Sequence, residues 1–498
     1  MNSSDNGKYI LAIDQGTSGS KAIIFNNSGE ICFEGRAPLK SFYPSEGRVE
    51  QDPDEIYRTV LSAVRGAAEA FTAAGNNPKD IACCGISNQR ETFVLWDKAG
   101  CPLAPAVVWQ CKRSIPVCRR LLDEGYEKLI REHTGLFIDP YFSATKVVQL
   151  CEENPEIRRA VDSGEAYFGT VDSWLLFRLT GGVHKIDYTN ASRTMLFNLK
   201  DLSWDNELIE LFGLSGLKLP EAVPSGADFG CSDFDGIFAR PLQITAMIGD
   251  SHAAAFGEGC FEKGAAKATM GTGSSILLNT GELVEPADTT MVSTICWSTE
   301  EQVSYALEGI IVSCGSTLTW LRDQLGLFNT SAEASEIAMQ TGSSGTVILI
   351  PAFSGLGAPW WKMSEQASIR GLSFESDKNH VIRAGFESIV FQITDVLHAM
   401  EKDANRALKS IRIDGGVSES SFVMSSIAEL NKAEIRRCRL REASALGAAL
   451  MAGLKGGVYE SIEQLKKLKY DDEIITETED NQELQNKYEQ WVETMRGL

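Results

Sequence analysis

The chain has 498 residues, of which 43% are apolar and 23% charged, and its formal net charge is -21. A chain of this length exceeds one hydrophobic core, so we expect two domains. The acidic balance disfavours nucleic acid and anionic membrane surfaces as partners. The sequence shows no basic stretch followed by an apolar one near residue 1, and no apolar run long enough to span a bilayer. We therefore expect neither export nor membrane insertion. The 12 cysteines are scattered, which disfavours a metal site or a disulfide framework, and we expect a cytoplasmic protein.

The first pattern that indicates a ligand is an apolar run that ends at Asp14, followed by a turn of glycine and hydroxyl residues and a second apolar run from Ala22. This pattern predicts two strands joined by a turn whose backbone amides can surround phosphate oxygens. Asp14 stands where a carboxylate could hold Mg²⁺ through water. The alternative is an ordinary hairpin with a polar turn.

The next segments predict an α/β domain. Pro53 follows an Asp cap and opens a helix, and an apolar strand over 81–86 leads to Arg90 and Glu91. The alternative for these two residues is a surface ion pair. Trp109 and Tyr141 lie beside polar residues, as expected of rings that face a polyol, although core packing is the commoner role of such rings.

We place the domain boundary near residue 253, after a stretch rich in glycine, proline and charge. Just before it, the strand over 244–248 ends in Gly249 and Asp250. Asp250 then has three possible roles, which are magnesium contact, catalytic base and helix N-cap.

A second strand–turn–strand, with Gly271 and Thr272 in its turn, resembles the first in kind. Two such turns predict a duplicated fold that closes on a nucleotide from both sides. Gly415 and Gly416 follow another strand and would let an adenosine lie against backbone, the alternative being a plain tight turn. Helices are predicted over 380–400 and 443–454, and the acidic chain from about 458 is predicted to be a peripheral helical tail.

Taken together, these landmarks resemble the FGGY carbohydrate kinases, and among them the glycerol kinases, over roughly residues 8 to 455. The matching motifs are Asp14–Thr17, Asn88–Thr92, Val108–Cys111, Asp139–Ser143, Asp187–Asn198, Pro351–Pro359 and Asp414–Gly416. The resemblance implies two actin/hexokinase-like (ribonuclease H-like) α/β domains, each a mixed five-stranded sheet with flanking helices, and a cleft between them. It assigns the polyol pocket and first phosphate loop to residues 1–253, and nucleotide binding to residues 254–498.

The resemblance also implies a role for individual residues. Asp250 matches the catalytic base, and Asp14 and Asp250 match the magnesium site. The residues that match polyol contacts are Arg90, Glu91, Trp109, Tyr141, Asp250, Ser251 and Ser275. The residues that match contacts to the nucleotide and its phosphates are Thr17, Ser18, Lys21, Gly271, Thr272, Gly315, Gly415, Gly416 and Ser420.

The sequence departs from the family pattern at several of these places. Ser251 stands where glycerol kinases usually carry Gln, and Ser275 where they carry Phe, so a buried ring is lost and two hydroxyls are gained. The fructose 1,6-bisphosphate loop of bacterial enzymes is absent, with residues 234–240 in its place, and that inhibition is expected to be lost. The other departures are Lys21 for Arg, Gln149 for Trp and Ser420 for Asn.

We therefore predict an ATP- and Mg²⁺-dependent polyol phosphotransferase with glycerol as the leading substrate. A kinase for a four- or five-carbon polyol or ketose is the alternative that the two serines favour. A non-catalytic, actin-like nucleotide- or polyol-binding sensor is the alternative from another class, and the complete set of Asp14, Arg90, Glu91 and Asp250 argues against it. The family also implies a homodimer or homotetramer.

Overall fold

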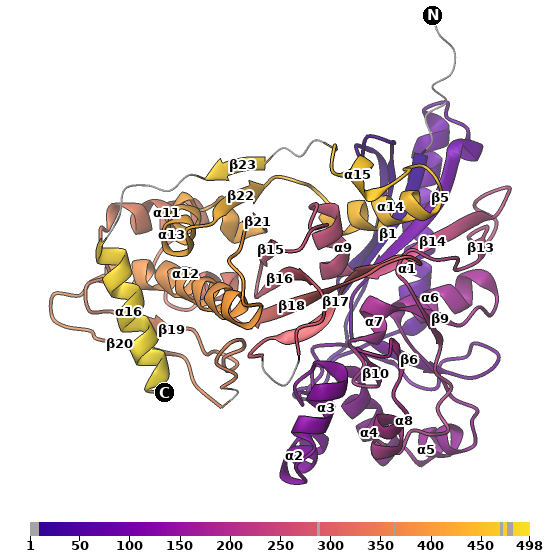
Figure 1. The fold of residues 1–498 in the computed structure, drawn as a ribbon, viewed down its shortest axis with the longest axis horizontal. Helices are drawn as coiled ribbons and strands as arrows, with labels where there is room; N and C mark the ends of the chain where they lie inside the picture. The colour runs from indigo at the N-terminus through magenta and orange to yellow at the C-terminus, as the bar shows by residue number, and fades with distance from the viewer. Residues whose placement is uncertain (1–8, 286–288, 363, 469–471, 476–481) are drawn as a thin grey trace, which may run out of the picture.

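The first sheet is built around the predicted hairpin at the start of the chain. The computed structural model describes residues 9–285, 289–362, 364–468, 472–475 and 482–498, and Figure 1 shows its two halves side by side. The first sheet has six strands in the order β13-β14-β5-β1-β2-β3. Its strands are β1 (Tyr9–Gly16), β2 (Gly19–Phe25), β3 (Ile31–Pro38), β5 (Ile81–Asn88), β13 (Cys231–Ser232) and β14 (Leu242–Gly249).

The second sheet has seven strands in the order β17-β18-β16-β15-β21-β22-β23. Its strands are β15 (Ala265–Met270), β16 (Ser274–Gly281), β17 (Val292–Ser298), β18 (Val303–Ile311), β21 (Ser410–Asp414), β22 (Glu434–Cys438) and β23 (Asp472–Ile475).

Five strands of each sheet share one topology. In the first sheet β1 pairs antiparallel with β2 and parallel with β5, β2 pairs antiparallel with β3, and β5 pairs parallel with β14. In the second sheet β15, β16, β18, β21 and β22 repeat this pattern in the same order. The predicted mixed five-stranded domain is thus the common core. The sheets exceed five strands because the short β13, the strand β17 and the tail strand β23 pair along their edges.

Helix α1 (Pro53–Ala73) shows how the sequence sets the packing. Asp52 caps its N-terminus by accepting a hydrogen bond from the Asp54 amide, and Pro53 occupies the first turn. Its apolar stripe, which includes Ile56 and Phe71, is fully buried against the first sheet. The backbone of Gly35 on β3 approaches the Ala63 carbonyl so closely that a Cβ would overlap it.

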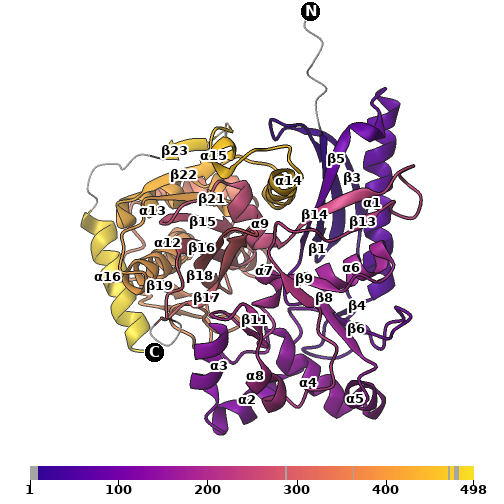
Figure 2. The same cartoon turned by 45° about the vertical axis from the view of Figure 1, so that its right-hand side comes forward.

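Helix α14 (Ala443–Lys455) belongs to the second half of the chain but packs on the first sheet. It lies against α9 (Asp250–Gly257), β1, β5 and β14, as the turned view in Figure 2 shows. Gly447 and Gly257 let the two helix backbones touch, because a Cβ on either would overlap a carbonyl of the partner helix. The chain therefore crosses back to the first sheet after building the second.

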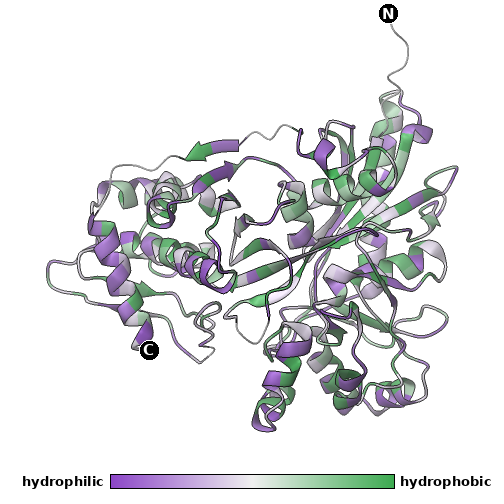
Figure 3. Ribbon diagram, in the orientation of Figure 1, coloured by the Kyte–Doolittle hydropathy of each residue, from purple (hydrophilic) through white to green (hydrophobic). Residues whose placement is uncertain are grey.

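The tail after residue 458 is helical only in part, contrary to our expectation, and its last helix covers the outer side of the second half. After α15 (Ile462–Leu465) it adds β23 to the second sheet and ends in α16 (Gln482–Arg496). Trp491 of α16 is fully buried and donates a hydrogen bond to Asp395, at 2.8 Å. Figure 3 shows apolar and polar positions alternating along α16, as expected of a helix with one buried face. Residues 469–471 and 476–481 of this tail lie outside the described residues.

The remaining elements flank the two sheets. The helices on the first half are α2 (Ile115–Asp123), α3 (Glu127–Thr134), α4 (Ser143–Glu153), α5 (Pro155–Asp162), α6 (Val171–Thr180), α7 (Tyr188–Ala191) and α8 (Asn206–Leu211), and those on the second are α10 (Gly315–Asp323), α11 (Ser331–Gln340), α12 (Lys378–Asp403) and α13 (Ser421–Asn431). A small sheet joins β4 (Glu50–Gln51), β7 (Ala106–Val107), β6 (Phe93–Trp96) and β8 (Tyr167–Thr170). The short remaining strands are β9 (Lys185–Asp187), β10 (Phe197–Asn198), β11 (Ser203–Trp204), β12 (Glu221–Val223), β19 (Ile348–Ile350) and β20 (Ser368–Arg370). Among the described residues, no helix combines the length and apolarity needed to cross a bilayer.

Candidate active site

The first predicted turn joins β1 and β2, so the expected hairpin is present. Asp14 and Lys21 face each other across the hairpin, and the Ser87 hydroxyl donates to Asp14 Oδ1 at 2.9 Å. Burial raises the pKa of Asp14 to about 6, Lys21 opposes that rise, and the carboxylates of Asp250 and Glu442 add to it. These charges therefore lie close enough to act on one another at the mouth of the hairpin.

The second turn, between β15 and β16, is bordered by close backbone contacts at glycine. The Gly315 amide donates to the Gly271 carbonyl at 2.9 Å, and a Cβ on Gly315 would lie only 2.6 Å from that oxygen. Gly415 has φ 90°, and its Cβ would lie 2.5 Å from the Met270 carbonyl, so this position requires glycine. A Cβ built on Gly416 would have no neighbouring atom within 4 Å, so this position borders open space. The structure thus brings the predicted Gly271, Gly315 and Gly415 together.

A network of charged side chains, all buried except Asp250, joins the two domains. Arg90 places Nε 3.3 Å from Asp250 Oδ1 and Nη2 2.9 Å from Glu308 Oε1. Arg193 contacts both Glu91 and Glu308, each at 2.7 Å. Since Glu308 lies on β18 of the second sheet and the other four residues lie on the first half of the chain, the network crosses the interface.

Sequence reasoning missed Glu308 and assigned no role to Arg193. The signal for Glu308 was a carboxylate within an otherwise apolar strand pattern. Burial alone would raise the pKa of Glu308, but Arg193 and Arg90 outweigh it and hold the pKa well below its usual range. Burial raises the pKa of Glu91, against the pull of Arg90 and Arg193. Arg90 and Glu91 are therefore not the alternative surface ion pair, because both are buried and each pairs with another residue.

The aromatic residues adjoin the first turn. Trp109 Nε1 donates to Thr17 Oγ1 at 2.9 Å, and the Trp109 and Tyr141 ring centroids are 5.5 Å apart. Lys146, a buried residue that we did not predict, donates to the Tyr141 carbonyl at 2.7 Å. Its burial lowers the pKa of Lys146 to about 8. Ser18 lies exposed at the turn.

Asp250 is the first residue of α9, and Gly249, not Asp250, is its N-cap. The N-cap interpretation of Asp250 is therefore wrong. The Asp250 side chain is 37% exposed, and one of its oxygens accepts from the Ser251 amide at 2.7 Å. This leaves the carboxylate accessible for the two remaining roles, which are base and metal contact.

Two other predicted residues, Ser420 and Ser275, form side-chain hydrogen bonds within the second half of the chain. The Ser420 hydroxyl caps α13 by accepting from the Val423 amide, and it shares a hydrogen bond with Ser335 at 2.8 Å. Ser275 Oγ donates to Glu308 Oε1 at 3.0 Å and so joins the interdomain network.

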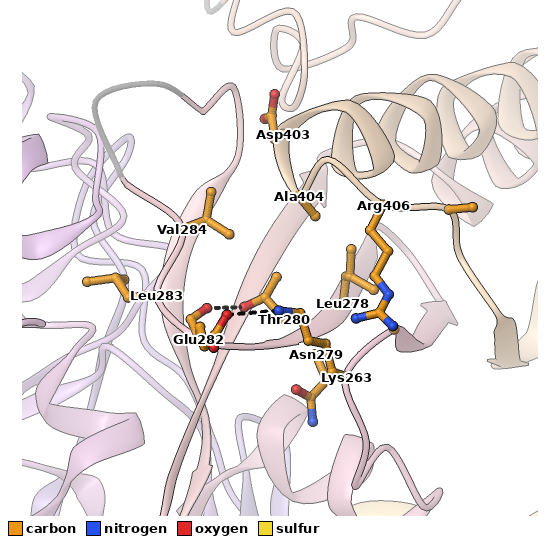
Figure 4. A pocket seen from close by; sticks show the side chains of 12 residues that line it. Lys263, Leu278, Asn279, Thr280, Glu282, Leu283, Val284, Asp403, Ala404 and Arg406 are labelled. Atoms are coloured by element: carbon orange, nitrogen blue, oxygen red, sulfur yellow. Dashed lines mark hydrogen bonds and ion pairs between the residues drawn. The ribbon is translucent and has the colours of Figure 1, made fainter.

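The pocket in Figure 4 is separate from the candidate active site. It lies between the end of β16 and the end of α12, and Thr280, Glu282 and Arg406 are among its lining residues. No predicted site residue lines it.

Comparisons with known proteins agree with this geometry. Residues 9–257 match the N-terminal domain model, and residues 266–455 the C-terminal domain model, of the FGGY family of carbohydrate kinases. The chain is 42% identical over 486 residues to a glycerol kinase of Thermoanaerobacter sp. (strain X514), covering 97% of each chain. It is 43% identical over 462 residues to a glycerol kinase of Caldanaerobacter subterraneus subsp. tengcongensis, covering 92% of each.

Solved structures match as well. Glycerol kinase of Plasmodium falciparum with ADP superposes with a TM-score of 0.90 and 31% identity, covering 98% of this chain and 97% of that one. A ligand-bound xylulose kinase of Lactobacillus acidophilus, with a TM-score of 0.87, 20% identity and 98% of each chain covered, shares the fold.

Two sheets of one topology, joined by a charged network beside a glycine-lined turn, define a two-domain phosphotransferase of the actin/hexokinase-like fold. The chain belongs to the FGGY family of carbohydrate kinases.

Proposed function

We propose that this enzyme transfers the γ-phosphoryl group of ATP to glycerol, giving glycerol 3-phosphate. The observation that carries the proposal is the partly exposed Asp250 carboxylate, fixed 3.3 Å from Arg90 beside the phosphate hairpin. Relatives named glycerol kinase, more than 40% identical over nearly the full chain, support glycerol as the acceptor.

Asp250 accepts the proton of the attacking hydroxyl in this mechanism. Phosphoryl transfer needs mainly positioning and charge neutralisation, so one well-placed carboxylate is sufficient as a base. Arg90 and Glu91 bind the neighbouring hydroxyls, one as a donor and the other as an acceptor. Trp109 and Tyr141 pack against the carbon chain and help to exclude water.

The glycine-lined turn suits the nucleotide, because Thr272 lies exposed in the turn and the backbone at Gly416 borders open space. Asp14 and Asp250 would hold Mg²⁺, which neutralises charge on the phosphates when bound. The donor set fits this ion, since Mg²⁺ typically uses one or two carboxylates together with waters and phosphate oxygens. Within the described residues no group of three or more His, Cys, Asp or Glu is placed to hold a metal ion.

ADP release from Mg-ATP, measured with glycerol, erythritol, threitol, pentitols and ketoses, tests the proposal. The highest kcat/KM is expected with glycerol. Turnover with none of these acceptors would overturn the proposal and favour the sensor alternative.

A four- or five-carbon polyol or ketose is the second candidate. It is favoured by Ser251 and Ser275, two small, partly exposed residues at the site, of which Ser275 is hydrogen-bonded to Glu308. Their hydroxyls could serve additional substrate hydroxyls. If this candidate is right, Ser251→Gln combined with Ser275→Phe shifts the preference toward glycerol, whereas unchanged specificity would remove it.

The dimer or tetramer and the cytoplasmic location stay predictions. Sedimentation velocity of the purified chain would measure the oligomeric state.

A further inference from the structure

A carboxylate from the second half of the chain reaches the first phosphate hairpin. Glu442 Oε2 lies 2.5 Å from Lys21 Nζ, and Glu442 Oε1 lies 2.9 Å from Arg36 Nη2. More than 400 residues of sequence separate Glu442 from each cation. A single carboxylate thus bridges strands β2 and β3 to the start of α14.

The backbone at Glu442 is in an unusual conformation. Its φ is 62°, in the left-handed region where glycine is favoured, and its side chain is only 12% exposed. A residue with a side chain in this region costs stability, and such strain concentrates at functional positions. The strain itself does not identify a function, but it directs attention to what the side chain contacts.

The position of Glu442 is fixed by its neighbours on both sides. The next residues start α14, whose backbone touches α9 at Gly447 and Gly257. Ser444 Oγ donates to the Asp250 carbonyl at 3.1 Å, so the start of α14 is tied directly to the residue proposed as the base. The carboxylate is therefore held in place relative to Asp250.

Lys21 is correspondingly restrained. It lies opposite Asp14 in the hairpin register, at the end of the strand pair that forms the phosphate turn. A free lysine carries considerable rotamer entropy, and an ion pair with a fixed carboxylate removes part of that freedom before the nucleotide binds. Arg36, bound to the other oxygen, reduces the repulsion that Glu442 would exert on incoming phosphates.

We propose that Glu442 is a positioning residue for phosphoryl transfer, which holds the Lys21 ammonium at the phosphate turn while Arg36 shields the remaining negative charge. The inference rests on the proposed function, because it assigns Lys21 to the phosphates of the nucleotide. Glu442 itself touches no reacting atom.

Three variants distinguish the effect of the Glu442 charge, the effect of the backbone strain at Glu442 and the effect of disturbing Arg36. Glu442→Gln removes the charge, and we expect kcat to fall about tenfold while KM for Mg-ATP changes less than about threefold, since the lost interaction orients a group. Glu442→Gly removes the carboxylate and also relieves the left-handed strain, so it should be as slow but no less stable in thermal unfolding. Glu34→Gln is the matched control, because Glu34 also contacts Arg36, at 3.1 Å, and should leave kcat unchanged.

A double-mutant cycle with Lys21→Met then tests the route of the effect. If Glu442 acts through Lys21, adding Glu442→Gln to Lys21→Met causes no further loss of kcat. Additive losses, or a wild-type kcat in Glu442→Gln, would overturn the inference. These outcomes are distinct from failure of the proposed function, which would appear as absence of polyol-dependent ADP release in the wild-type enzyme.

Discussion

The two halves of the molecule share a five-strand topology but use it differently. At the first turn, Asp14, Lys21 and the nearby Asp250 supply charge, and the surrounding contacts run between side chains. At the second turn, Gly271, Gly315 and Gly415 supply close backbone approach and little charge.

The comparison indicates that the shared five-strand topology places the turns, and that the residues in each turn decide its chemistry. A carboxylate near a cation can move a proton or hold a metal, whereas absent side chains leave room for a flat ligand against the backbone. We therefore expect charged side chains of the first half to control kcat. We expect the space left by the glycines of the second half to control nucleotide affinity. Six substitutions test this difference.

The largest effect is expected in the charged half. Asp250→Asn keeps the shape but removes the proposed base, and kcat should fall by about 10²- to 10⁴-fold. Nucleotide affinity, measured by calorimetry with ADP, should stay within about threefold of wild type because the second turn is untouched. A variant with a near-normal rate would remove Asp250 as the base.

The next effect concerns the network that joins the halves. Glu308→Gln leaves the buried Arg90 and Arg193 without their shared counter-charge, and breaking such a buried pair costs about 3–5 kcal/mol of unfolding free energy. Because Arg90 also contacts Asp250, kcat/KM for the polyol should fall as well. Urea unfolding and steady-state kinetics of the same preparation measure both.

Glu387→Gln is the matched control for that change. Glu387 is buried and accepts from Arg383 at 2.7 Å and from Ser344, much as Glu308 accepts from arginine and Ser275. We expect it to destabilise the second domain while the folded enzyme keeps its kcat/KM. Equal kinetic losses in both variants would mean that stability, not the site, explains the result.

A third prediction concerns pH and the support beneath the aromatic residues. The pKa of buried Lys146 is lowered to about 8 from 10.5, so the unfolded chain binds more protons between these values and stability rises with pH there. Relative to Lys146→Met, the wild-type unfolding free energy should increase by about 2 kcal/mol from pH 8 to pH 10. Urea titrations of the two proteins at both pH values measure this difference, and equal pH dependence would mean that Lys146 keeps an ordinary pKa when folded.

Much of the frame followed from the sequence, because its signals are local. Asp52 and Pro53 marked the start of α1, and the paired apolar runs marked both hairpins. The return of α14 to the first sheet and the burial of Trp491 could not be predicted, since they depend on contacts between distant segments. For the same reason Glu308 and Glu442 were missed, as neither belongs to a motif and each acquires partners only when the two halves meet.

The last prediction concerns two neighbouring glycines, which should behave differently and include the smallest expected change in stability. Gly415→Ala puts a Cβ against the Met270 carbonyl at φ 90°, so the unliganded enzyme should lose about 2 kcal/mol of stability and bind ADP more weakly. Gly416→Ala meets no protein atom within 4 Å, so stability should change by less than about 0.5 kcal/mol. If adenosine lies against this loop, Gly416→Ala should still weaken ADP binding, because its methyl group would occupy the space of the ligand. Calorimetry and thermal unfolding of both variants separate the two causes, and unchanged ADP affinity in Gly416→Ala would place the adenosine elsewhere.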